Sequence, residues 1–123
     1  MMENNMHNKE RNFVARNTAK SFFATIHIAG SFSQAKNLCR QWVMNGACVQ
    51  IAQCTYVYTG GVEEGMTVRL MQYPRFQRSE VEILEMAQEL GTYLAQELCQ
   101  ISFSIETPYN TTYYQAEGYE KRS

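Results

Sequence analysis

Residues 47–73, ACVQIAQCTYVYTGGVEEGMTVRLMQY, contain two stretches typical of β-strands on either side of a turn. β-Branched and aromatic residues are frequent over 47–58, which predicts a long strand. The Gly-Gly pair at 60–61 predicts a turn and the start of a loop to residue 65. Apolar and polar residues alternate over 66–73, which predicts the partner strand, and Pro74 ends it because proline cannot donate to a sheet.

The sequence before this hairpin predicts a strand and then a helix. Residues alternate over 21–29, so that one face of the strand is apolar. Ser33 is the predicted N-cap of a helix over 34–45, where apolar residues recur at spacings of three and four. Gly46 is typical of the end of such a helix.

The sequence after the hairpin predicts a second helix and two more strands. Ser79 and Glu82 form a capping box, which predicts that a helix occupies about 80–98. Residues 101–106 alternate between apolar and polar, which predicts a strand. A turn over 107–110 and a short last strand over 111–114 follow.

The predicted order of elements is β-α-β-β-α-β with one short C-terminal strand added. This order favours a ferredoxin-like α+β fold, in which one antiparallel sheet carries both helices on one face. We expect a flexible arm over 1–20, a single domain over 21–115 and a polar tail over 116–123. The other sheet face suits a dimer interface or a ligand site, and its candidate residues are Thr25, His27, Gln50, Gln53, Tyr56 and Arg69.

The composition of the 123 residues excludes several kinds of chemistry. There is no Asp and there are two His, which excludes a Ser-His-Asp triad, an aspartate magnesium site and a three-histidine zinc site. The net charge of −1 gives no general attraction to nucleic-acid polymers, and no apolar run is long enough for a membrane span. We therefore expect no catalytic residues, no metal and no cofactor.

The segment over 73–76, Tyr-Pro-Arg-Phe, concentrates groups that bind nucleotides. Arginine forms paired hydrogen bonds with phosphate, and a neighbouring ring stacks on a base. The free N–H groups of the helix that begins after Ser79 favour an anion nearby. The candidates are Tyr73, Arg75, Phe76 and Arg78. The alternative is that the rings cover the core and the arginine pairs with a glutamate.

Three other positions are weaker candidates. Tyr58 precedes the Gly-Gly turn, where the backbone can approach a ligand closely. Asn110 and Thr111 lie in a turn whose polar groups could contact a ribose or a base. At each of these places an ordinary turn is the alternative. His27 is more typical of a surface or interface histidine than of a catalyst.

The Y-T-G-G turn at 58–61 and the Y-P-R-F segment at 73–76, with A-C-V-Q at 47–50, resemble a group of small bacteriophage proteins over 22–115. That group resembles phage Thoeris anti-defence proteins of the cyclic ADP-ribose sponge type. The resemblance implies a homo-oligomer in the host bacterial cytoplasm that sequesters a cyclic ADP-ribose isomer, or cyclic oligonucleotides, without cleaving them. Gln72 and Gln77 depart from the usual residues of the group.

Two alternatives to a sponge remain open. The first is a phage-encoded inhibitor that binds a host defence protein directly, through the polar sheet face or the acidic helix. The second is a small phosphoesterase-like enzyme, which is disfavoured because one of its two histidines, His7, would come from the arm. The sequence therefore predicts a binding protein that is not an enzyme.

Overall fold

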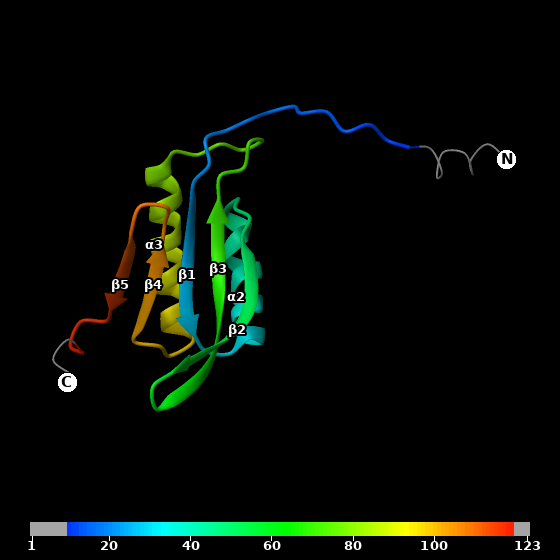
Figure 1. Ribbon diagram of the computed structural model, residues 1–123. Helices are drawn as coiled ribbons and strands as arrows, with labels where there is room; N and C mark the ends of the chain where they lie inside the picture. Colours follow the sequence, from blue (N-terminus) through cyan, green and yellow to red (C-terminus); the bar gives the residue numbers. More distant parts are fainter. Residues whose placement is uncertain (1–9, 120–123) are drawn as a thin grey trace.

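The computed structural model describes residues 10–119, which form one five-stranded sheet and two α-helices (Figure 1). The elements are β1 (Phe23–Ala29), α2 (Phe32–Trp42), η1 (Val43–Asn45), β2 (Gln50–Tyr58), β3 (Gly61–Met71), α3 (Glu80–Glu97), β4 (Ser102–Glu106) and β5 (Thr111–Gln115). The strand order is β2-β3-β1-β4-β5, and every neighbouring pair is antiparallel. The predicted ferredoxin-like α+β class is confirmed, with β5 extending the sheet beyond β4.

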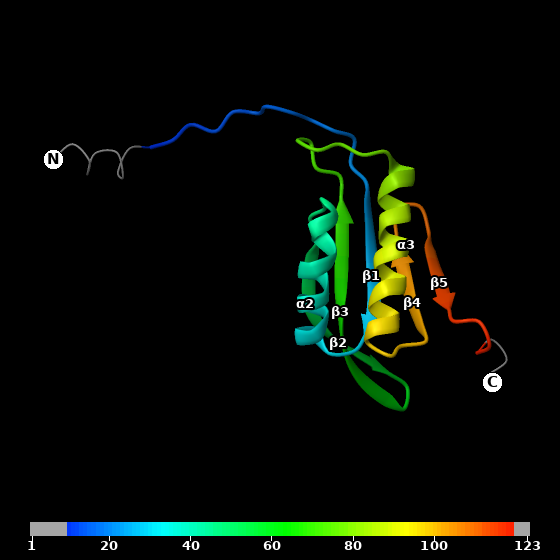
Figure 2. The same cartoon turned by 180° about the vertical axis from the view of Figure 1, so that it is seen from behind.

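Both helices lie on the same face of the sheet, as Figure 2 shows from the helix side. The core lies between the sheet and the two helices. Alternate strand residues point into it, as the sequence pattern predicts. Its largest fully buried side chains come from the sheet and from α3, and they are Ile26, Met66, Val68, Leu90, Leu94 and Ile105. The opposite sheet face has no helix over it (Figure 1).

Several predicted boundaries are wrong, including the start of β2, which lies at Gln50 and not at residue 47. Helix α2 begins two residues early, because Ser31 and not Ser33 is its N-cap and accepts a hydrogen bond from the Gln34 amide at 3.3 Å. Strand β3 begins directly after the turn at Gly61, so the predicted loop to residue 65 is strand. The positive φ of Gly60, 88°, closes the turn tightly enough for the ladder to continue to its end.

Gly91 is a buried residue of α3 that faces the Phe103 ring of β4. A Cβ at this position would be 2.5 Å from Cε1 of Phe103, whose ring stacks on Tyr114 with centroids 5.1 Å apart. The sequence alone indicates only a weak point in a helix. The structure shows that the missing side chain makes room for a core ring.

We expect Gly91→Ala to lower the free energy of unfolding by about 1 kcal/mol, because the clash with Phe103 outweighs the gain in helix propensity. Urea unfolding measures this change. Thr92→Ala is the matched control, since Thr92 is exposed on the same helix and gains propensity without a clash. Equal stabilisation of the two variants would contradict the packing argument.

The two ends of the described chain lie outside the sheet. Residues 10–22 precede β1 without helix or strand. Phe22 is buried in the core, and the segment before it extends away from the domain (Figure 1). The rest of the predicted arm, residues 1–9, and the last four residues of the predicted tail lie outside the described residues. Between residues 10 and 119, no helix is long and apolar enough to cross a membrane.

Candidate functional site

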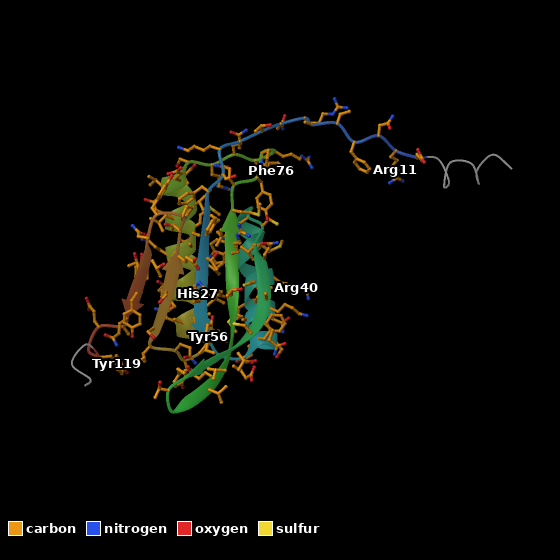
Figure 3. The ribbon with its side chains drawn as sticks, viewed as in Figure 1. Arg11, His27, Arg40, Tyr56, Phe76 and Tyr119 are labelled. Carbon is orange, nitrogen blue, oxygen red and sulfur yellow. The ribbon has the colours of Figure 1, made fainter. Side chains whose placement is uncertain are left out.

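The sheet face without helices carries two rows of mostly polar residues across the strands. Pairing of β1 with β3 and β4 places Arg69 and Glu106 on either side of Thr25. The neighbouring row is centred on His27, which is labelled in Figure 3. From β2 to β5 the rows are Gln50, Arg69, Thr25, Glu106, Thr111 and Ala52, Thr67, His27, Ser104, Tyr113.

Five of the six residues proposed for this face lie on it. Gln53 is the exception, because it pairs with Met66, whose side chain is buried on the helix side. Because side chains alternate along a strand, Gln53 lies on the opposite face from Gln50 and Tyr56, and the three could not share one face. Thr25, His27, Gln50, Tyr56 and Arg69 share the open face.

His27 and Glu106 form a pair on this face. The Nε2 atom of His27 lies 2.9 Å from Oε1 of Glu106, and the two side chains are 33% and 49% exposed. The ring donates to the carboxylate and so fixes its orientation. A carboxylate and an imidazole that are both accessible to solvent can bind a cationic group or transfer a proton.

Arg69 lies two strands away from Glu106 and is half-buried. Its guanidinium carbon is 4.7 Å from the centroid of the Phe23 ring, and its Nε is buried without a hydrogen-bond partner. Within residues 10–119 no carboxylate forms an ion pair with it. It borders a recess of about 450 Å³, lined also by Thr25, Gln50, Ile51, Ala52 and Thr67.

Tyr56 covers the open face at Gly65. A Cβ at Gly65 would lie 2.7 Å from Cε2 of the Tyr56 ring, so the ring rests on the bare backbone. Its hydroxyl donates to the Met66 carbonyl at 2.9 Å. Burial, together with the neighbouring Cys54 thiol, raises the pKa of Tyr56, so the phenol stays protonated and remains a donor.

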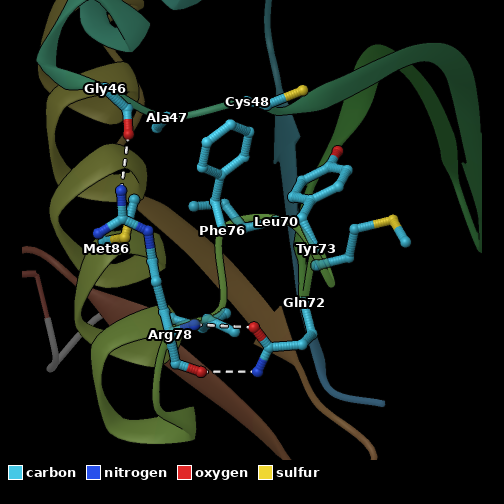
Figure 4. Close-up of a pocket in the computed structure, with 11 residues that line it drawn as sticks. Gly46, Ala47, Cys48, Leu70, Gln72, Tyr73, Phe76, Arg78 and Met86 are labelled. Carbon is cyan, nitrogen blue, oxygen red and sulfur yellow. Dashed lines mark hydrogen bonds between the residues drawn. The ribbon is translucent and has the colours of Figure 1, made fainter. Parts of the chain in front are cut away.

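A separate cavity of about 400 Å³ lies between the end of β3, the loop that follows it and the start of α3 (Figure 4). Three predicted site residues line it: Tyr73, Phe76 and Arg78. Nη2 of Arg78 donates to the Gly46 carbonyl at 2.7 Å, which spans the cavity wall. The Gln72 amide group bonds both the N–H and the C=O of Arg78, at 2.8 and 2.6 Å.

Tyr73 connects this cavity with the open face. A hydrogen bond with the Cys48 thiol, and then burial, raise the pKa of Tyr73, while the nearby charge of Arg69 acts in the opposite direction. Tyr73 is therefore close to both the cavity wall and the Arg69 recess.

The structure does not bring the other predicted residues together. Arg75 lies over Phe76, at 5.2 Å from the ring centroid, and does not line the cavity. Asn110 and Thr111 lie at the same end of the sheet, at the turn between β4 and β5, whereas Tyr58 lies at the opposite end (Figure 1). These assignments stay predictions.

The predicted anion site at the start of α3 is already occupied by the protein's own groups. Ser79 Oγ accepts from the Glu82 amide at 3.0 Å, and Glu82 accepts from the Ser79 amide at 2.9 Å. The acidic side chain of Glu80 adds negative charge to this first turn. An incoming phosphate would have to compete with these carboxylates.

Sequence reasoning missed Glu106 as a site residue. The alternation over 101–106 correctly predicts that Glu106 points away from the core, but its partner His27 is 79 positions away. Only the register between β1 and β4 brings the two together. No group of three or more potential metal ligands occurs in the described part of the chain.

Comparisons with known proteins give a fold match and no family match. No family model matches the chain, and no curated protein matches it significantly. Two solved structures of a phage SAM lyase match it, one in complex with S-methyl-5'-thioadenosine (TM-score 0.57) and one in the apo state (TM-score 0.58). Each is 18% identical and covers 89% of this chain and 100% of the lyase chain, so the likeness establishes a shared fold.

These matches correct one expectation. The prediction that the chain is not an enzyme is wrong on this finding, because both matched structures are those of a lyase. The expected likeness to small phage proteins is supported, while the matches give no support to a Thoeris sponge in particular.

Proposed function

We propose that this protein binds S-adenosylmethionine and cleaves it to S-methyl-5'-thioadenosine, as a phage anti-defence enzyme. The observation that carries the proposal is the Glu106–His27 pair, exposed on the helix-free face of a fold shared with phage SAM lyase. Between residues 10 and 119, the structure gives no other ion pair between a basic side chain and a carboxylate. The open face is therefore where we place the reaction.

The charges on this face suit the substrate. S-adenosylmethionine carries a sulfonium and an α-ammonium group, and Glu106 offers a carboxylate to either. Cleavage of the bond between sulfur and the methionine γ-carbon gives the electron pair to sulfur, which leaves as a neutral thioether. Because a lyase uses no water, the four-carbon fragment must close on itself or lose a proton, and His27 and Glu106 are placed to assist the proton transfer.

The anti-defence role connects this proposal with the resemblance of the sequence to phage proteins. Host methyltransferases, including those of restriction systems, use S-adenosylmethionine, so its removal in the host cytoplasm would weaken them. Cyclic ADP-ribose isomers share the adenosine part with this substrate. A homo-oligomer in which a second copy covers the open face would exclude water from the site, and this partner remains part of the proposal.

Incubation of the purified protein with S-adenosylmethionine tests the function directly. We expect S-adenosylmethionine to disappear and S-methyl-5'-thioadenosine to form in equal amount, as measured by chromatography after heat denaturation. Cyclic ADP-ribose isomers incubated in parallel should be recovered intact. If S-adenosylmethionine is recovered unchanged at high protein concentration, the lyase proposal is wrong.

A further inference from the structure

We infer that Arg69 and Glu106 together hold the α-amino acid group of the substrate, with the carboxylate on Arg69 and the ammonium on Glu106. The inference rests on the proposed function and adds to it a basis for recognising the methionine part. It starts from an arginine whose hydrogen-bonding capacity is unused by the described chain.

Arg69 is held in place but not neutralised. The Phe23 ring packs against its guanidinium at 4.7 Å, and its Nε is buried with no partner. A buried donor without a partner costs free energy, so such a group is usually satisfied by a ligand or by water. Arg78, by contrast, already donates to the Gly46 carbonyl.

The register places an acid at the matching distance. Arg69 and Glu106 both pair with Thr25, on β3 and β4 respectively. Since neighbouring strands lie about 4.8 Å apart, the two Cα atoms are separated by about 10 Å across Thr25. Thr25, which lies between the two residues, also lines the recess of about 450 Å³ beside Arg69.

The chemistry of each end matches one half of a zwitterion. The planar guanidinium of arginine forms two parallel hydrogen bonds with a carboxylate. The Glu106 carboxylate, fixed by His27 at 2.9 Å, accepts from an ammonium. The recess of about 450 Å³ beside Arg69 opens to solvent, and Thr25 and Thr67 line it.

Two uncleavable ligands test the inference. S-adenosylhomocysteine and S-methyl-5'-thioadenosine are both neutral adenosyl thioethers, and only the first has the amino acid group. We expect Arg69→Gln to weaken binding of S-adenosylhomocysteine by about tenfold or more, because it removes a charge-assisted pair. Binding of S-methyl-5'-thioadenosine should change by less than twofold. Calorimetric titration measures both affinities.

Matched variants separate recognition from damage to the fold. Arg40→Gln removes an exposed arginine on α2, on the helix side of the sheet, and should leave both affinities unchanged. Arg69→Lys keeps the positive charge and the aliphatic part of the side chain but cannot form two parallel hydrogen bonds with a carboxylate. Its affinity for S-adenosylhomocysteine should therefore fall between those of wild type and Arg69→Gln. If both Arg69 variants bind both ligands as tightly as wild type, or lose both equally, the inference is wrong. If the wild-type protein binds neither ligand, the proposed function itself fails.

Discussion

Glu106→Gln is expected to lower the rate of S-adenosylmethionine cleavage by about 100-fold or more, since it removes the charge and the basicity of the group that faces the substrate. Glutamine has nearly the same shape, and Glu106 is 49% exposed, so the fold should be unaffected. Formation of S-methyl-5'-thioadenosine at saturating substrate gives the rate. Thermal unfolding of the same sample checks that the variant is folded.

The matched control for this variant is Glu89→Gln. Glu89 is an exposed glutamate on α3, on the other side of the sheet, so the same chemical change there should leave the rate unaltered. His27→Ala should also slow the reaction, because it releases the Glu106 carboxylate from its 2.9 Å bond. A rate for Glu106→Gln within twofold of wild type would remove Glu106 from the proposed active site.

Gly65→Ala is expected to lower the free energy of unfolding by about 2–3 kcal/mol, which is near the upper end of overpacking effects. The added Cβ would lie 2.5 Å from the Ile28 carbonyl oxygen and 3.0 Å from Cα of Ala29. These are backbone atoms of β1, so they can move only by distorting the ladder beside His27. Alanine also lowers the conformational entropy of the unfolded chain, but this smaller gain in stability does not offset the loss. Chemical denaturation measures the loss.

Gly61→Ala provides the same substitution in the same strand with a different outcome. The atoms it would meet belong to the Tyr58 side chain, which is 53% exposed and can rotate away. We expect a change within about 0.5 kcal/mol, as for most exposed positions. Equal destabilisation of the two variants would show that the clash with β1 is not the cause of the loss at Gly65.

Local patterns in the sequence predict most of the fold. The alternation over 21–29 and 101–106 and the capping box at Ser79 each depend on neighbouring residues, and the structure confirms them. The start of α2 was missed because Ser31 and Ser33 are equally good caps by composition. A choice between two such serines is settled by how the chain leaves β1.

The candidate site was harder to predict, because it depends on register. The residues around Tyr73 stood out as a contiguous motif, and the structure does group three of them around one cavity. The pair of His27 and Glu106, and the position of Arg69 across Thr25, come from strands that are far apart in the sequence. No periodicity within one segment contains that information.

The bonds that hold Arg78 have a consequence for the cavity beside Tyr73. The guanidinium is tied to Gly46 and its backbone to Gln72, so the loop between β3 and α3 is fastened to the end of the helical layer. A loop fixed in this way has already lost its conformational entropy during folding. A ligand that enters the cavity therefore contacts a preorganised wall, and its affinity is not reduced by the cost of ordering the loop.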